Sequence, residues 1–193
     1  MIQTGPAGAD LPWVTLHAFV DESSRGDAYL LVAACLDPAQ LNRTRKLMKS
    51  LLLPGQRELH FKRESPRLRR LALSRMEEAG LGCWVYAADC GNGHEPARQA
   101  CLAALTVDLL GVDATRMVMD SRDDRDRLDE ATIRVVLTKI ARASGLVYEH
   151  HHGPGEPLLW IADAVAWSVG AGGDWGRRSE PLVGRRVTVP VPG

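Results

Sequence analysis

Two apolar runs separated by a short polar turn constrain the fold of this chain most strongly. The segments WVTLHAFVD (13–21) and AYLLVAACLD (28–37) are rich in β-branched, aromatic and other apolar residues, as strands are. The turn SSRGD lies between them, and its Gly26 tolerates the backbone conformation of a tight reversal. The two runs are therefore predicted to pair as an antiparallel hairpin.

Helices and strands alternate after this hairpin. Hydrophobic periodicity predicts further strands at 81–90, 115–120 and 146–152, with helical stretches before, between and after them. The clearest helix begins at Ser65 and Pro66, because Ser caps a helix and Pro suits its first position. The pattern predicts an α/β fold with a mixed five-stranded sheet flanked by helices.

The chain length indicates one domain. A chain of 193 residues buries one proper core, and its apolar fraction of 45% and charged fraction of 25% are ordinary for a globular protein. We expect a flexible N-terminal arm at 1–12, the domain itself at 13–170 and an irregular tail rich in Gly, Arg and Pro at 171–193.

The N-terminal segment and the cysteines predict a soluble, cytoplasmic protein. MIQTGPAGADLP has neither the basic flank nor the apolar centre of a signal peptide. The longest apolar run, AYLLVAACL, is far shorter than the roughly 20 residues of a membrane-spanning helix. The cysteines occur singly, without zinc-site spacing, and are predicted to be free thiols of a reducing compartment. They are Cys35, Cys83, Cys90 and Cys101.

Three carboxylates stand at the ends of apolar strands or inside an apolar helix. Asp21 ends the first strand and Asp120 ends TRMVMD, so both would lie at one end of the sheet if these strands are neighbours. Asp163 interrupts the helix LLWIADAVAWSV, where a lone carboxylate is costly unless it is paired, hydrogen-bonded or metal-bound. Glu22 would point to the opposite face from Asp21, which makes it a poorer ligand.

A fourth carboxylate and a histidine lie in RELHFKR (57–63). This segment is predicted to be extended, which places Glu58 and His60 on one side because side chains alternate along extended backbone. Glu58 would join the other carboxylates, and His60 would transfer a proton or contact a phosphate. Each residue also has a plain structural explanation, as a turn residue, a cap or part of a polar face. Only their combination predicts a site.

Oxygen ligands of this kind predict Mg²⁺ or Mn²⁺. Magnesium prefers oxygen ligands and keeps several waters, so few protein groups suffice. Two such ions roughly 4 Å apart activate the attacking water and stabilise the leaving oxygen in phosphodiester hydrolysis.

Other metal and nucleotide patterns are weaker. In the run HHH only His150 and His152 share a face of a strand, and spacing places no third ligand beside them. Asp123 and Asp124 are predicted to be N-capping residues of the following helix. The chain contains no G-x-x-x-x-G-K, G-x-S-x-G or G-x-G-x-x-G stretch, so nucleotide-cradling and serine-hydrolase interpretations lack their motifs.

Charge is balanced overall but is uneven along the chain. There are 24 basic and 24 acidic residues, so attraction to nucleic acid would have to come from local patches. One such patch extends from Arg57 to Arg75, and a second is GRRSEPLVGRR near the C-terminus. The first is either a solvated helix face or a phosphate-binding surface. In the second case the nucleic-acid-binding residues would be Lys62, Arg63, Arg67, Arg69 and Arg70.

The segments FVDES, ELHF, MVMD and LLWIADAVAW, in this order and spacing, resemble the family known as domain of unknown function 3800. The resemblance extends from about His17 to Val169 and implies a ribonuclease H-like fold. It also implies a divalent-metal site, whose ligands would be Asp21, Glu58, Asp120 and Asp163.

Three functional hypotheses follow. The leading one is a Mg²⁺- or Mn²⁺-dependent nuclease acting on RNA or DNA phosphodiester bonds, and its catalytic residues would be Asp21, Glu58, His60, Asp120 and Asp163. The second is a catalytically inactive module of the same fold that binds nucleic acid or a protein. The third is a dimerisation or effector component of a larger defence-like system, such as a homodimer, and its interface anchors would be Trp160, Trp167 and Trp175.

Overall fold

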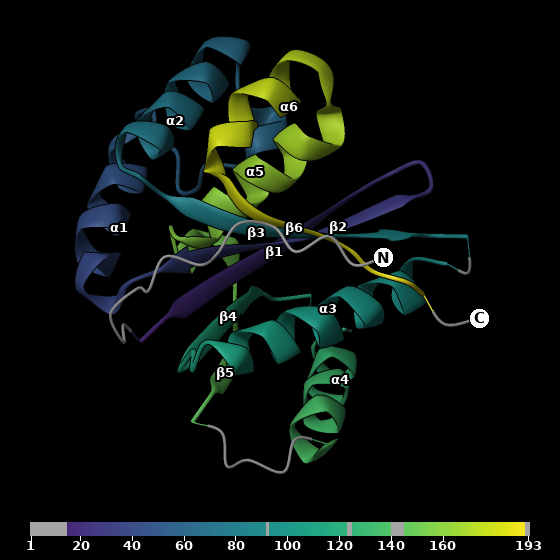
Figure 1. Cartoon of the computed structure of the whole chain (residues 1–193). Coiled ribbons are helices and arrows are strands. Elements are labelled where there is room, and N and C mark those ends of the chain that lie inside the picture. The colour runs from purple at the N-terminus through teal and green to yellow at the C-terminus, as the bar shows by residue number, and fades with distance from the viewer. Residues whose placement is uncertain (1–14, 92, 123–124, 140–144, 192–193) are drawn as a thin grey trace.

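The computed structural model describes residues 15–91, 93–122, 125–139 and 145–191. One twisted sheet runs through the molecule, with helices on both faces (Figure 1). Its strand order is β5-β4-β1-β2-β3-β6. The strands are β1 (His17–Arg25), β2 (Ala28–Leu36), β3 (Gly82–Asp89), β4 (Arg116–Asp120), β5 (Val147–His151) and β6 (Val183–Thr188). The predicted N-terminal arm at 1–12 lies outside the described residues.

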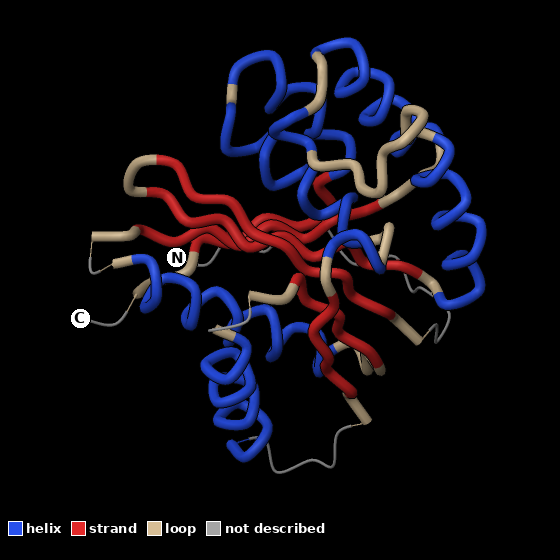
Figure 2. The backbone as a smooth tube through the Cα atoms, turned by 180° about the vertical axis from the view of Figure 1, so that it is seen from behind, coloured by secondary structure: helices blue, strands red, loops and turns tan. Residues whose placement is uncertain are grey.

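The predicted hairpin is confirmed. β1 and β2 pair antiparallel, and the turn between them contains Gly26, whose φ of 55° is in the left-handed region that glycine tolerates. The turn projects from the body of the sheet (Figure 2). The first strand does not end at Asp21, because β1 continues in the hairpin as far as Arg25; what ends at Val20 is its pairing with β4.

The sheet is mixed, as predicted. β1, β4 and β5 are parallel, β3 and β6 are parallel, and β2 is antiparallel to both β1 and β3. Of the six described strands, β2 alone therefore runs against the others. Parallel neighbours such as β1 and β4 need long crossover connections, and here helices supply them.

In the residues that the structure describes, six α-helices cover the sheet. α1, α2, α5 and α6 lie on one face and α3 and α4 on the other (Figure 1). None of these described helices is long and apolar enough to cross a bilayer. Their bounds are α1 (Leu41–Ser50), α2 (Pro66–Glu78), α3 (His94–Gly111), α4 (Asp126–Lys139), α5 (Leu159–Ala171) and α6 (Gly173–Ser179).

Both faces of the sheet are buried, which explains why its strands are nearly continuously apolar. Phe19 and Val32 belong to the core on the α5 side, whereas Val20 and Leu31 belong to the core on the α3 side. Neighbouring residues of one strand therefore serve two separate cores, and any polar pair on β1 is divided between the faces in the same way.

The C-terminal region corrects two predictions. The described part of 171–193, a segment expected to be irregular, contains α6 and β6. Because β6 pairs with β3, the described sheet has six strands instead of five. The sequence concealed this edge strand because its middle residues, Gly184, Arg185 and Arg186, are exposed and do not alternate. Charged residues of this kind suit an edge, where they discourage further strand pairing.

RELHFKR departs from the extended conformation predicted for it. Its end forms the 3-10 turn η2 (Phe61–Arg63), and the segment lies outside the sheet. Leu59 and Phe61 are fully buried, so they anchor the segment against the core between α2 and α5. The start of α2 is confirmed, because the Ser65 side chain accepts a hydrogen bond from the backbone N–H of Leu68.

Candidate metal centre and nucleic-acid surface

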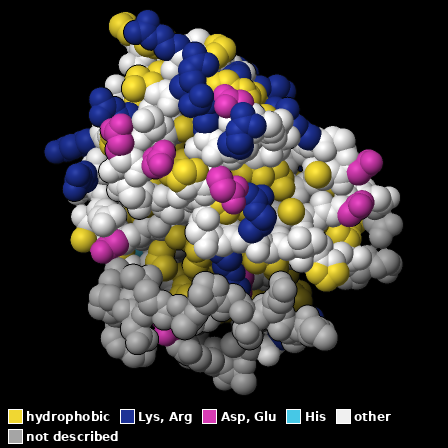
Figure 3. Space-filling view, turned by 45° about the horizontal axis from the view of Figure 1, so that its top comes forward, with side chains coloured by type: hydrophobic (Ala, Val, Ile, Leu, Met, Phe, Trp, Pro, Cys, Tyr) yellow, Lys and Arg dark blue, Asp and Glu magenta, His cyan; other side chains and the backbone are white. Residues whose placement is uncertain are grey.

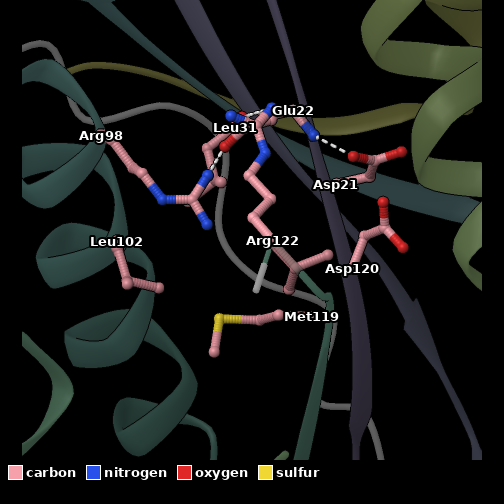
Figure 4. Close-up of a pocket in the computed structure, with 9 residues that line it drawn as sticks. Asp21, Glu22, Leu31, Arg98, Leu102, Met119, Asp120 and Arg122 are labelled. Carbon is pink, nitrogen blue, oxygen red and sulfur yellow. Dashed lines mark hydrogen bonds and ion pairs between the residues drawn. The ribbon is translucent and has the colours of Figure 1, made fainter. Parts of the chain in front are cut away.

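β1 and β4 bring two carboxylates to one edge of the sheet. Their parallel register pairs Val20 with Met119, the residues that directly precede Asp21 and Asp120. Asp21 and Asp120 consequently lie side by side on the same face (Figure 4). α5 packs across β1 and β2 on this face and carries Asp163.

The charges of these three carboxylates act on one another. Burial raises the pKa of Asp21 well above its usual value, and the carboxylates of Asp163 and Asp120 raise it further. Burial also raises the pKa of Asp120, and the charges of Asp163 and Glu58 add to this shift. Such shifts at Asp21 and Asp120 require carboxylates that are close together in a poorly solvated place. A cation bound among them would reverse the shifts.

Asp163 is held by the η2 turn. Its Oδ2 accepts a hydrogen bond of 2.7 Å from the backbone N–H of Phe61, and His60 Nδ1 lies 3.4 Å from the same oxygen. The hydrogen bond with Asp163 raises the pKa of His60. With only 15% of its side chain exposed, Asp163 needs such partners because an unpaired carboxylate is costly to bury.

Glu58 and Asp120 approach one another at Gly153. A Cβ atom on Gly153 would lie 3.2 Å from Glu58 Oε2 and 3.6 Å from Asp120 Oδ1. The backbone of Gly153 also donates a hydrogen bond to Asp120, which opposes the rise of its pKa. The Gly153 carbonyl accepts a hydrogen bond of 2.8 Å from the Trp160 ring nitrogen, which fixes the turn between β5 and α5. The absence of a side chain at Gly153 therefore allows this approach.

The structure thus brings together all four predicted carboxylates and His60, from β1, β4, α5 and the segment before η2. Their role as metal ligands stays a prediction. Sequence reasoning missed two contributors, Gly153 and the backbone amide of Phe61. The run GPG (153–155) indicates a turn but not what the turn contacts, and a backbone donor leaves no trace in side-chain identity.

Glu22 lies on the other face of the sheet, as strand alternation predicts. Its carboxylate, 6% exposed, accepts a hydrogen bond from the Tyr29 hydroxyl and pairs with Arg98 and Arg122. Figure 4 shows Glu22 with these arginines, apart from Asp21 and Asp120. The negative charge of Glu22 is therefore already compensated by two guanidinium groups.

A second group that could hold a metal ion lies on the Glu22 side of the sheet. One ligand atom each from Asp126, Asp129 and His150 lies within 4.8 Å of the others. Within the described part of the chain, the predicted carboxylates form no group that tight. His150 from the HHH run thus joins two aspartates, and His152 is not part of this group.

The carboxylate oxygens of this second group already accept hydrogen bonds within the protein. Arg98 donates to both oxygens of Asp129, at 2.8 and 2.5 Å. Asp126 accepts from the Ser121 hydroxyl at 2.7 Å and from the Arg122 backbone N–H at 2.9 Å. We interpret the group as an ion-pair network that joins α3 to α4. The predicted caps Asp123 and Asp124 lie outside the described residues.

The basic patch lies on η2 and α2. Lys and Arg side chains, with acidic ones among them, gather over the part of the molecule formed by α2 and α6 (Figure 3). Four of the five predicted nucleic-acid-binding residues are exposed, namely Lys62, Arg63, Arg67 and Arg70. Arg69 differs, because it is partly buried and donates to the backbone carbonyls of Phe61 and Lys62 at 2.8 and 2.7 Å.

The tryptophans do not form the exposed anchors predicted for a homodimer. Trp160 is 4% exposed. Trp167 and Trp175 are partly buried and pack against the core, with their ring centres 5.7 Å apart. Trp167 also meets the ring of Phe61 edge-on at 5.6 Å. These residues therefore stabilise the packing of α5, α6 and η2.

Comparisons with known proteins give structural similarity alone. No protein-family model matches the chain and no curated protein does, so the resemblance to the domain of unknown function 3800 family stays a prediction. The chain is similar to ribonuclease H2 from Pyrococcus horikoshii OT3, with 15% identity over 79% of this chain and 71% of that chain and a TM-score of 0.49. It is also similar to a chain in the structure of the PCNA:RNase HII complex from Archaeoglobus fulgidus. The identity is 16% over 78% of this chain and 69% of that chain, and the TM-score is 0.46. At this level function does not transfer, and it has to be argued from the site.

Proposed function

We propose that the protein is a Mg²⁺- or Mn²⁺-dependent nuclease that hydrolyses RNA or DNA phosphodiester bonds. The supporting observation is the convergence of four carboxylates, in which burial and neighbouring negative charges raise the pKa of Asp21 and of Asp120. Ionised carboxylates so placed repel one another, and a cation bound between them would relieve this repulsion and keep them ionised. The donors of this cluster are carboxylate oxygens, which suit Mg²⁺ or Mn²⁺ better than softer metals. The ligands would be Asp21, Glu58, Asp120 and Asp163.

The chain's own groups would prepare this site. Of the described contacts, those of the Phe61 amide and of His60 both fall on Oδ2 of Asp163, so Oδ1 would be the atom offered to a cation. When bound, Mg²⁺ or Mn²⁺ supplies Lewis acidity toward a phosphate oxygen and lowers the pKa of a bound water. His60, with 40% of its side chain exposed, would donate a proton to the leaving oxygen or contact the phosphate.

The basic residues beside the cluster would bind the substrate backbone. Lys62 and Arg63 belong to the same turn whose Phe61 amide holds Asp163, and Arg67 and Arg70 follow on α2. Exposed cations this near a carboxylate cluster would place phosphates next to it without reading base sequence. We propose a ribonuclease H-like fold for this function. The mixed sheet, in which β2 is the one described strand antiparallel to the others, is consistent with that fold.

One observation favours a second function, a catalytically inactive module that binds nucleic acid. In the described residues, the ligand atoms that lie within 4.8 Å of one another belong to the second group and not to the predicted cluster. This alternative predicts salt-dependent binding of nucleic acid but no cleavage with any divalent ion.

Cleavage of labelled single strands, duplexes and RNA–DNA hybrids in Mg²⁺, Mn²⁺, Ca²⁺ or EDTA separates these proposals. The nuclease proposal predicts products with Mg²⁺ or Mn²⁺, none in EDTA, and loss of cleavage in Asp120→Asn. Asp126→Asn is the matched control, since it removes a carboxylate from the second group only. Undiminished cleavage by Asp120→Asn would contradict the assignment.

A further inference from the structure

We propose that Arg69 is a positioning residue for Asp163, acting through the η2 turn and not through contact with nucleic acid. Its effect on metal binding and cleavage rests on the proposed function, whereas its effect on the turn does not. Arg69 was predicted from the charge pattern to be a phosphate-binding residue, but its Nε and Nη2 donate to backbone carbonyls of the protein itself.

The Arg69 side chain donates hydrogen bonds to two successive carbonyl groups of η2. Its Nε donates to the carbonyl of Phe61 at 2.8 Å and its Nη2 to the carbonyl of Lys62 at 2.7 Å. A guanidinium is planar, is always charged and has its donors in a rigid fork, so it holds two acceptors in one fixed geometry. A lysine would supply a point charge without that fork.

Aromatic packing fixes the guanidinium from the side of α5. Its central carbon lies 4.1 Å from the ring centre of Trp167, which follows Asp163 by about one helical turn. The rings of Trp175 and Phe61 are 5.7 and 6.0 Å away. Cation–aromatic contacts at these distances are attractive, and they are stronger where water is partly excluded. Arg69 on α2 therefore ties η2 to α5.

The turn that Arg69 holds is the turn that holds Asp163. Phe61 begins η2, and its fully buried ring anchors this end of the turn in the core. The backbone N–H of Phe61 donates to Asp163 at 2.7 Å, and His60 enters the same contact from the preceding position. Without Arg69 the carbonyls of Phe61 and Lys62 would each lose a guanidinium donor. The carbonyl of Phe61 would keep only the 3.2 Å hydrogen bond from the backbone N–H of Glu64, so the turn would hold the N–H of Phe61 toward Asp163 less firmly.

The start of α2 has its own support, which separates this role from a general structural one. Ser65 caps α2 through the N–H of Leu68, and Leu68 is buried in the core. The neighbouring Arg70 carries the same charge on the same helix but is exposed. Arg70→Ala is therefore a matched control for Arg69→Ala.

Hydrogen exchange of single amides in metal-free protein, followed by NMR, tests this proposal. In Arg69→Ala the Phe61 amide should exchange about tenfold faster or more, the scale expected when a hydrogen bond to a charged group is lost. The Leu68 amide should keep its rate, and Arg70→Ala should change neither. In Arg69→Lys the exchange rate of the Phe61 amide should lie between those of the wild type and of Arg69→Ala. Added methylguanidinium should slow exchange of the Phe61 amide in Arg69→Ala. An unchanged Phe61 rate, or equal acceleration of Phe61 and Leu68, would overturn the proposal.

A Mn²⁺ titration of the same variants distinguishes this inference from the proposed function. If both hold, Arg69→Ala binds Mn²⁺ about tenfold more weakly than the wild type, the lower end of the effect of removing supporting groups around metal ligands. Arg70→Ala should bind as the wild type does. If the wild type binds no Mn²⁺, the proposed metal site fails, and the comparison of the Phe61 and Leu68 amides still decides the role of Arg69.

Discussion

Asp163 illustrates what single residues contribute to this site. It was recognisable in the sequence because a carboxylate on a helix that is apolar nearly all round needs a partner. The partner found is a backbone amide, Phe61, together with His60. Which of the chain's backbone amides would serve could not be read from residue types, since almost every residue has one.

His60→Ala tests the proton-transfer role at the residue scale. If His60 protonates the leaving oxygen, kcat should fall by about a hundredfold or more, as for other general acids. Mn²⁺ affinity, which His60 supports only through Asp163, should fall by no more than about tenfold. Cleavage rates and calorimetric Mn²⁺ affinity measure the two effects. His94→Ala, which removes an exposed histidine of α3, should leave both unchanged. A His60→Ala protein with wild-type kcat would limit His60 to a structural role.

Gly153→Ala tests the close approach of Glu58 and Asp120. The new methyl group would lie 3.2 Å from Glu58 Oε2, so the carboxylate would have to move. Mn²⁺ affinity should fall by roughly tenfold or more, as it does when groups supporting metal ligands are disturbed. Gly155→Ala adds the same methyl group in the same turn with nothing within 4 Å, so its affinity should match the wild type. Equal affinities for both variants would contradict the geometry.

Thiol reactivity provides a pH prediction for the core. All four cysteines are free, and burial raises the pKa of Cys35 and of Cys101 to about 12 and that of Cys83 still further. Because the thiolate is the reactive form, alkylation of Cys35, Cys83 and Cys101 in the folded protein should stay slow from pH 7 to 9. A free thiol with a pKa of about 8.5 speeds up greatly over that range. Mass spectrometry after iodoacetamide treatment checks this. Rapid labelling without denaturant would show that these thiols are accessible.

At the scale of elements, β1 contributes side chains to polar groups on both faces of the sheet. Its neighbouring residues Asp21 and Glu22 serve opposite faces, one in the carboxylate cluster and the other in the network with Arg98. This division was predictable, because alternation along a strand is a property of the backbone. β6 and η2 were not predictable in the same way. Neither has a hydrophobic period, and each is held by contacts with distant segments.

Arg98→Ala tests the network that joins β1, α3 and α4. The change leaves the buried carboxylates of Glu22 and Asp129 without their shared guanidinium, so the free energy of unfolding should fall by ~3–5 kcal/mol. Urea denaturation measures this, and Arg127→Ala, an exposed neighbour on α4, is the control. A loss below ~1 kcal/mol, as for an ordinary surface ion pair, would contradict this account of the network.

The same network predicts an acid dependence of stability. Burial alone would raise the pKa of Asp129, but hydrogen bonds from Arg98 and His150 lower it below its usual value. A folded-state pKa below the unfolded one stabilises the protein above the unfolded pKa, and this contribution disappears as pH falls through the folded value. Asp129→Asn should therefore lose less stability than the wild type on acidification below about pH 4. Urea denaturation at pH 7 and at low pH measures the free energy of unfolding of both proteins. The same loss between the two pH values in the wild type and in Asp129→Asn would contradict this prediction.

At the scale of the whole molecule, the sheet separates two polar assemblies. The carboxylate cluster lies on the α5 face, and the compensated ion-pair network lies on the α3 face. The sequence singled out Asp21 and Asp120 because each follows an apolar run, and Asp163 because it interrupts an apolar helix, although β1 continues past Asp21. It could not show that Asp126, Asp129 and His150 would gather as well, because their proximity depends on where the folded chain places the start of α4 relative to His150.

We propose that Asp21, Glu58, Asp120 and Asp163 jointly bind divalent cations. Calorimetric titration with Mn²⁺ of the wild type, Asp163→Asn and Asp126→Asn tests it most directly. We predict saturable binding that Asp163→Asn abolishes and Asp126→Asn leaves intact. The same binding heat in the wild type and Asp163→Asn, or a loss in Asp126→Asn alone, would contradict the claim.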